Sequence, residues 1–102
     1  MDNPLSKLLN FYKSRNFVQA EKEYLNIAKK VKPNHELLNL YGVILFQLKK
    51  YDQAIIQLKK SIEINPNYYQ GYNSLGNIFF KKNDFNAALE AYQKAIDIKF
   101  DY

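Results

Sequence analysis

Apolar side chains recur along this chain at helical spacing, and short polar breaks interrupt them at regular intervals. No segment shows the sustained apolar-polar alternation that is typical of a strand. The breaks are rich in asparagine, lysine and proline, which cap or end helices. The pattern predicts six helices, joined by connections short enough to make neighbours antiparallel. Their expected ranges are 4–14, 17–31, 35–48, 52–64, 68–81 and 85–98.

An internal repeat underlies these breaks. Three alanines, Ala20, Ala54 and Ala88, lie 34 residues apart. Two glycines and three aromatic residues keep the same period: Gly42 and Gly76, and Phe17, Tyr51 and Phe85. The length of 102 residues equals three such units. The period therefore predicts one all-α repeat domain, an α-solenoid of helix-turn-helix units, with units at 1–34, 35–68 and 69–102.

Glycine and alanine recur where two helices joined by a short loop must come close together. We expect Gly42 to face Ala54 and Gly76 to face Ala88, because such small residues let the backbones approach. Larger side chains interlock away from these contacts, and they are Tyr24, Leu45, Leu58, Phe79 and Tyr92.

Composition and charge narrow the classes of function. The chain has 47% hydrophobic residues and a net charge of +5, but its lysine pairs fall on expected outer faces and helix ends, which makes nucleic-acid binding an unfavoured interpretation. There is no cysteine, which excludes disulfides and thiolate metal sites. Neither a membrane-spanning segment nor a secretion signal is evident, so we expect a cytoplasmic protein.

Nothing in the sequence indicates catalysis. The only histidine, His35, lies at a unit junction, where we expect it to serve a helix start. The glycines fall within expected helices and not in a phosphate-binding loop, and the carboxylates form no convergent pair. We expect no cofactor, no metal and no enzymatic activity.

Taken together, these positions resemble the tetratricopeptide repeat, a helix-turn-helix unit of about 34 residues. The third unit matches its pattern at Tyr72, Leu75, Gly76, Phe79, Ala88, Tyr92 and Ala95. The second unit matches at Leu38, Gly42, Leu45, Ala54, Leu58 and Pro66. The first unit is degenerate: it keeps Phe11, Ala20 and Tyr24, whereas Ala28 and Pro33 come one residue late.

The resemblance implies a right-handed superhelix in which the first helix of each unit lines a concave groove that binds partner peptides. The chain is then a non-enzymatic scaffold for protein-protein interaction. The family's groove positions fall here on Leu5, Leu9, Tyr12, Lys13, Asn39, Val43, Phe46, Gln47, Asn73, Asn77, Phe80 and Lys81.

Two features of this expected groove have a second interpretation. The aromatic ladder of Tyr12, Phe46 and Phe80 supplies apolar contact for a peptide, or it belongs to the core of the repeat. The asparagines could bind a peptide backbone, or reflect a chain with twelve asparagines in all; they are Asn39, Asn73 and Asn77.

One subfamily can be tested on the sequence. Tetratricopeptide domains that hold the acidic C-termini of chaperones use lysine, asparagine and arginine at five groove positions. The matching residues of this chain carry none of those side chains; they are Leu5, Leu9, Leu40, Gln70 and Ser74. Because a carboxylate buried without cations is poorly stabilised, we expect no such carboxylate clamp.

The C-terminal end leads to an alternative function. Arrays that resemble this one usually close with an extra helix, and here the sequence stops at a unit boundary. We expect some of Leu89, Tyr92 and Ile96 to be bare. Either the chain belongs to a longer protein, such as the N-terminal part of a transferase, or this end is an oligomerisation module that meets another copy.

Overall fold

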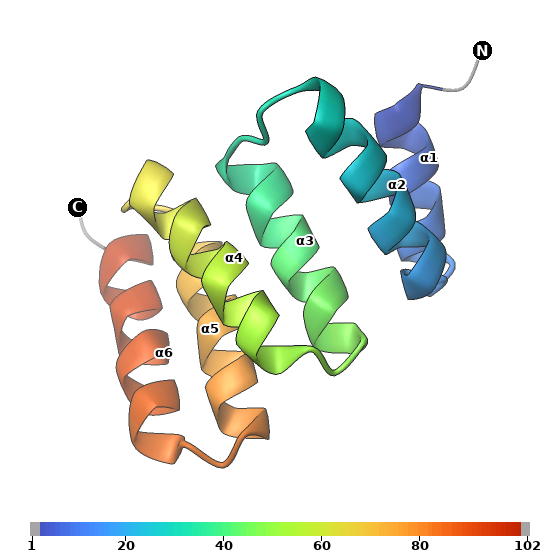
Figure 1. Ribbon diagram of the computed structural model, residues 1–102. Coiled ribbons are helices and arrows are strands. Elements are labelled where there is room, and N and C mark those ends of the chain that lie inside the picture. The colour runs from blue at the N-terminus through green and yellow to red at the C-terminus, as the bar shows by residue number, and fades with distance from the viewer. Residues whose placement is uncertain (1–2, 101–102) are drawn as a thin grey trace.

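Six helices follow one another through residues 3–100, the part of the chain that this computed structural model describes, and no strand occurs there. Each boundary lies within one residue of its expected place, so the predicted all-α architecture is confirmed. Figure 1 shows the helices crossing the molecule in chain order, with α1 and α6 at opposite ends. The helices are α1 Pro4–Lys13, α2 Phe17–Lys30, α3 His35–Gln47, α4 Tyr51–Ile64, α5 Tyr69–Lys81 and α6 Phe85–Lys99.

Asparagine side chains start the first helices of the first two units. The Oδ1 atom of Asn3 accepts a hydrogen bond of 2.8 Å from the backbone N–H of Leu5, and Pro4 occupies the first turn. In the same way Asn34 accepts from the N–H of Leu37 at 2.8 Å. Such caps satisfy amides that have no partner within the helix. The polar breaks seen in the sequence therefore work as helix starts.

The turn inside every unit has the same backbone conformation. Arg15, Lys49 and Asn83, which lie 34 residues apart, have φ of 62°, 63° and 64°. In the second unit the N–H of Lys50 donates to the carbonyl of Leu45 at 2.9 Å, a bond that closes the helix end in the manner of a Schellman motif. Glycine usually occupies this left-handed position, because a β-carbon there is strained.

Substituting Lys49→Gly is expected to stabilise the protein by about 0.5–1 kcal/mol, because it removes the β-carbon from a left-handed residue. Urea unfolding followed by circular dichroism measures the change. The matched variant Asn83→Gly should gain less, because asparagine tolerates this conformation better than lysine. Equal or lower stability of Lys49→Gly would show that the turn is not strained.

The two helices of the second and third units approach so closely that a β-carbon does not fit on the first helix. A β-carbon built on Gly42 would lie 2.6 Å from Cγ of Leu58 in α4. One built on Gly76 would lie 2.5 Å from the ring of Tyr92 in α6. Real β-carbons are not found at such distances, so both positions require glycine as the structure stands.

The partners of these glycines differ from those expected. For Gly76, the three nearest atoms all belong to Tyr92. The expectation that Leu58 and Tyr92 pack away from the glycine contacts was therefore wrong, because each lies directly against a glycine. For Gly42, the Ala54 carbonyl oxygen is third nearest at 3.4 Å, so that pairing is only part of the contact. Both alanines are buried. At each close approach, a large side chain of the second helix therefore packs against a glycine of the first helix.

The variant Gly76→Ala should lower the free energy of unfolding by up to about 2 kcal/mol. Displacing the Tyr92 ring costs about 1–3 kcal/mol as overpacking, and better helix propensity returns about 1 kcal/mol. The control is Gly71→Ala, whose β-carbon would lie 3.0 Å from Cγ1 of Ile62, a contact that a shift of a few tenths of an ångström relieves. Chemical denaturation of both variants should show a loss at Gly76 alone; equal losses would contradict a specific contact with Tyr92.

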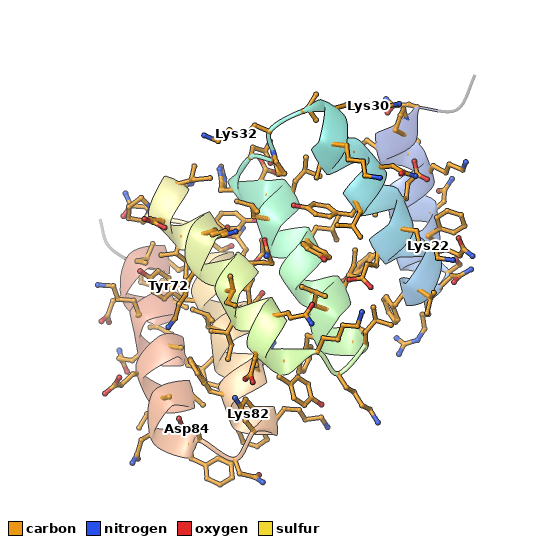
Figure 2. The ribbon with its side chains drawn as sticks, in the orientation of Figure 1. Lys22, Lys30, Lys32, Tyr72, Lys82 and Asp84 are labelled. Atoms are coloured by element: carbon orange, nitrogen blue, oxygen red, sulfur yellow. The ribbon has the colours of Figure 1, made fainter. Side chains whose placement is uncertain are left out.

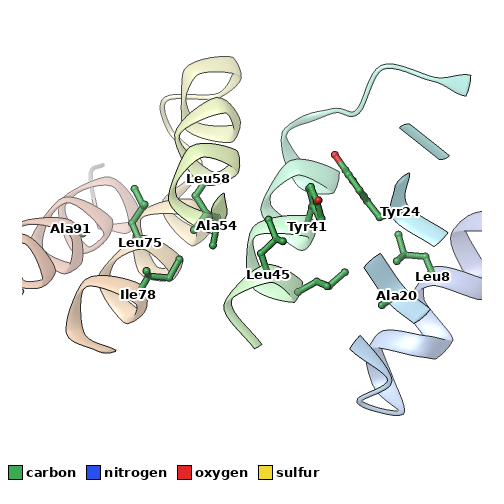
Figure 3. Close-up of a cluster of buried hydrophobic side chains, with 11 residues drawn as sticks. Leu8, Ala20, Tyr24, Tyr41, Leu45, Ala54, Leu58, Leu75, Ile78 and Ala91 are labelled. Atoms are coloured by element: carbon green, nitrogen blue, oxygen red, sulfur yellow. The ribbon is translucent and has the colours of Figure 1, made fainter. Parts of the chain in front are cut away.

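A tyrosine pair joins the first unit to the second. The rings of Tyr24 in α2 and Tyr41 in α3 stack with centroids 4.1 Å apart, and Figure 3 shows them together within the core cluster. The hydroxyl of Tyr41 donates to Glu21 at 3.1 Å, and Glu21 also pairs with Lys50 at 2.9 Å. The polar edge of this interface is therefore satisfied while the rings stay buried.

This interface predicts a loss of stability in alkali. Burial raises the pKa of Tyr41 to about 12, and the hydrogen bond and negative charge of Glu21 act in the same direction. Because the folded-state pKa lies above the unfolded value of 10.0, the contribution is complete below pH 10 and is lost as the pH rises toward 12. Unfolding measured between pH 8 and 12 should show a steeper decline for the wild type than for Tyr41→Phe, which costs about 0.5–1.5 kcal/mol at neutral pH. Parallel profiles would contradict this assignment.

Candidate functional site

Five of the residues expected in the concave groove surround one hollow between α1 and α3. Its volume is about 540 Å³, and we call it the α1–α3 groove. The expected residues that line it are Leu5, Leu9 and Tyr12 from α1, and Asn39 and Val43 from α3. The remaining lining residues are Asn34, Glu36, Leu37, Leu40 and Tyr68.

The lining of the α1–α3 groove is largely apolar. Among its ten residues in the described part of the chain, Glu36 is the one charged side chain, and no lysine or arginine contributes. Burial, followed by the negative charge of Glu36, raises the pKa of Tyr68 above its ordinary value. The groove therefore offers apolar contact with a weakly negative and hydrogen-bonding rim.

A smaller hollow continues the concave surface between α3 and α5. It measures about 100 Å³ and shares Val43 with the α1–α3 groove. Phe46, Gln47 and Asn77 of the expected set line it, together with Ser74 and Ile78. The structure thus brings eight expected residues to two adjoining hollows. The other four are exposed and line neither; they are Lys13, Asn73, Phe80 and Lys81.

The expected binding set omits several lining residues, and two of them, Leu40 and Ser74, appear in the sequence analysis only as positions of the carboxylate clamp. Leu40 follows Glu36 by four residues and precedes Val43 by three, so helical spacing alone would have placed it on the same face. Ser74 holds the corresponding position in the third unit. Tyr68 lies in the connection before α5, and no periodic signal points to it.

Each ring of the aromatic ladder packs on the aromatic residue that begins the next helix of its own unit. The centroid distances are 5.9, 5.7 and 5.4 Å in the three units, typical of favourable aromatic pairs. The pairs are Tyr12 with Phe17, Phe46 with Tyr51, and Phe80 with Phe85. This geometry supports the core interpretation for Tyr12 and Phe46, which are partly buried against the core, whereas Phe80 is 57% exposed.

Two of the three asparagines already accept hydrogen bonds from within the protein. The hydroxyl of Tyr92 donates to Oδ1 of Asn77 at 2.5 Å. The hydroxyl of Ser74 lies 3.2 Å from Oδ1 of Asn39 and 3.0 Å from the carbonyl oxygen of Gln70, so these two acceptors share its one proton. The amide N–H groups of these two residues are not used in those bonds, so a partner would meet them as donors.

His35 begins α3, as expected, and ties it to the end of α4. Its carbonyl accepts a bond of 2.7 Å from the buried hydroxyl of Ser61, and its Nε2 lies 3.3 Å from Nδ2 of Asn65. Its ring packs edge-on against Tyr68 at 4.7 Å. His35 therefore supports one wall of the α1–α3 groove. Over residues 3–100, no cluster of histidine, aspartate and glutamate has the makings of a metal site.

The positive charge lies mainly outside the groove. Figure 2 shows Lys30 and Lys32 projecting from the end of α2 and the connection that follows it. Lys82 forms an ion pair with Asp52 at 2.6 Å.

In the described region, none of the helices is long and apolar enough to cross a bilayer.

A second large hollow separates the far ends of α1 and α2. Its volume is about 520 Å³, and its lining combines apolar and charged residues, among them Pro4, Lys7, Ile27, Lys30 and Val31. In this first unit Leu8 occupies the position that Gly42 and Gly76 hold in the other units.

The last described helix, α6, carries exposed apolar side chains. Leu89 and Ile96 in α6 are exposed, whereas Tyr92 is half-buried because it packs on α5. The residues 34 positions earlier, Ile55 and Ile62 in α4, are partly buried against the core. Within the described residues, α5 covers this face of the second unit and nothing covers it on the third.

Two family models match the chain. The model described as "TPR repeat" matches residues 42–82, and the one described as "Tetratricopeptide repeat" matches residues 69–102. Together they extend over the second half of α3 and everything that follows. The first unit, which is degenerate in sequence, lies outside both matches.

Two curated relatives illustrate the range of proteins that contain such segments. Small glutamine-rich tetratricopeptide repeat-containing protein 2 of Saccharomyces cerevisiae is 43% identical over 54 residues, which cover 53% of this chain and 16% of that protein. The probable UDP-N-acetylglucosamine--peptide N-acetylglucosaminyltransferase SEC of Arabidopsis thaliana is 30% identical over 96 residues, which cover 93% of this chain and 10% of that protein. The chain thus spans less than a fifth of either relative.

Solved structures share the fold. A crystal structure of MamA superimposes with a TM-score of 0.87 at 23% identity, over 94% of this chain and 56% of that one. The second TPR of Spaghetti (RPAP3), bound to the HSP90 peptide SRMEEVD, gives 0.82 at 15% identity, over 90% and 85%. The TPR2B domain of yeast Sti1 in complex with pHsp70 gives 0.85 at 19%, over 95% and 79%. These likenesses confirm the right-handed α-solenoid and, at such identities, nothing beyond the fold.

Proposed function

The chain belongs to the tetratricopeptide repeat family, and from this we propose that it is a protein-binding scaffold that holds a segment of a partner in the α1–α3 groove. One observation carries the proposal. Apolar side chains from α1 and α3, two helices that are separated along the chain by α2, line a common hollow of about 540 Å³. Concave, mostly apolar sites with few polar groups are typical of ligand binding.

The chemistry of the lining indicates what kind of segment fits. Leu9, Leu40 and Val43 favour an apolar side chain of the partner. The amide N–H groups of Asn39 in this groove, and of Asn77 in the adjoining hollow between α3 and α5, are suited to backbone carbonyls of an extended peptide. Glu36 favours a neutral or basic flank over an acidic one.

We also propose that acidic chaperone tails are not the ligand. The related folds bound to HSP90 and Hsp70 segments have that partner by their own description. Here three of the five clamp positions are leucines, and all three line the α1–α3 groove: Leu5, Leu9 and Leu40. A carboxylate placed there would be desolvated beside apolar side chains and Glu36, with no cation from the lining to pair with it.

Peptide binding tests both proposals. Fluorescence anisotropy with short peptides that carry leucine or phenylalanine and neutral or basic flanks should give dissociation constants of order micromolar. The acidic peptide SRMEEVD should bind at least about tenfold more weakly, a difference of about 1.4 kcal/mol. Equal or tighter binding of SRMEEVD would contradict the apolar assignment.

A pair of valine variants locates the binding surface. Val43→Asp places a charge in the α1–α3 groove and should weaken peptide binding by about tenfold or more. Val18→Asp makes the same substitution at an exposed position of α2 and should leave binding unchanged. Circular dichroism confirms that both remain folded. Equal effects of the two variants would place the binding surface elsewhere.

Catalysis and location follow from the same proposal. We assign no catalytic role to these 102 residues, although one relative is named as a transferase. Because that relative is matched over only 10% of its length, any transferase chemistry would belong to other parts of such a protein. The location that we propose is cytoplasmic, in keeping with a chain that contains no cysteine.

A second function is favoured by the bare face of α6. Leu89 and Ile96 repeat the positions of Ile55 and Ile62, which α5 covers. We propose that this end of the solenoid is a docking face, separate from the groove because it lies on the second helix of its unit.

A further inference from the structure

The two ends of the solenoid differ in chemistry. In the second and third units, the face of the first helix that meets the preceding unit is mostly apolar: Tyr41 stacks on Tyr24, and Gly71 packs on Ile62. The corresponding positions of α1 are all polar and exposed. They are Asn3, Lys7, Asn10 and Ser14, equivalent to Leu37, Tyr41, Ile44 and Leu48 in α3.

The opposite end, α6, carries an exposed apolar row that we call the α6 stripe. It consists of Phe85, Leu89, Ile96 and Phe100, which are 56%, 67%, 50% and 56% exposed. The spacings between them are four, seven and four residues, so the order of spacings is the same from either end. Aromatic rings stand at its two ends and aliphatic side chains in its middle. At 1.5 Å per residue the row is about 22 Å long.

We infer that the α6 stripe binds the α6 stripe of a second copy of this chain, with the two helices antiparallel about a two-fold axis. This inference rests on the second proposed function, that the α6 end is a docking face. In this register Phe85 faces Phe100 of the second copy and Leu89 faces its Ile96, and each pair occurs twice. The axis passes close to Gln93, midway along the stripe.

The polar end argues for this pairing over a head-to-tail stack. In such a stack, α1 of one copy would cover α6 of the next. The stack would press the Lys7 ammonium and the Asn3 and Asn10 amides against Leu89 and Ile96. Burying these groups without partners costs free energy, whereas pairing two stripes buries like against like. The favoured assembly is therefore a closed dimer and not a growing chain.

The contact is small, because it uses one helix from each copy. Interfaces of this kind bury less than about 1,200 Å² and are correspondingly weak. A dissociation constant in the micromolar range or above is expected. The α1–α3 groove is built from first helices and stays open in this arrangement, so that the dimer presents two grooves to one partner.

Disulfide trapping tests the register. Because the chain has no cysteine, a single Gln93→Cys substitution introduces the only thiol, at an exposed site beside the predicted axis. Mild oxidation should convert most of this variant to a covalent dimer. The matched control is Lys94→Cys, also exposed, which points about 100° away around the helix and should remain monomeric. Equal trapping of the two variants would overturn the register.

Sedimentation equilibrium of the 102-residue chain tests the dimer itself. A mass that rises from monomer to dimer with concentration, and that Leu89→Asp returns to monomer with the helical signal intact, supports the inference. A mass that grows beyond the dimer would overturn it while leaving the α6 end as a docking face. A chain that stays monomeric up to millimolar concentration would overturn the dimer, while the α6 end could still be a docking face for a different protein.

Discussion

Two missing β-carbons set the geometry on which the rest of this structure depends. At Gly42 and Gly76 the first helix of a unit lies directly against a large side chain of the second, Leu58 or Tyr92. That contact fixes how tightly each hairpin closes, and hence how the first helices of successive units align along one concave surface. Tyr92 connects the two roles, since its ring fills the space beside Gly76 while its hydroxyl holds Asn77 at the concave surface.

Most of the fold could be predicted from the sequence, because helix starts and stops are local. The asparagine and proline breaks, and the period of 34 residues, place six helices to within one residue. Which side chain faces Gly76 is not local: it depends on how two helices rotate against each other, and Tyr92, expected away from the contact, lies directly against it. The groove was predictable only in part, because Tyr68 lines it from a connection that carries no periodic signal.

One repeat pattern yields two kinds of surface. The first helices turn mixed polar and apolar positions toward the concave side, where the α1–α3 groove forms. The second helices turn apolar positions toward the next unit, so each unit covers its predecessor and leaves its own face to be covered. The outer face of α1 is polar and needs no covering unit, whereas the α6 stripe is apolar and exposed.

The first helix is the least secured wall of the groove. Leu8 is the one buried side chain of its ten residues, and a hollow of about 520 Å³ lies beside its start. Local opening is easiest where few side chains are buried, so we expect α1 to detach from α2 more readily than α3 detaches from its neighbours. The groove would then be complete only while α1 is docked. A partner's apparent affinity is then its intrinsic affinity scaled by the docked fraction, which makes recognition and the ordering of the first unit a single coupled equilibrium.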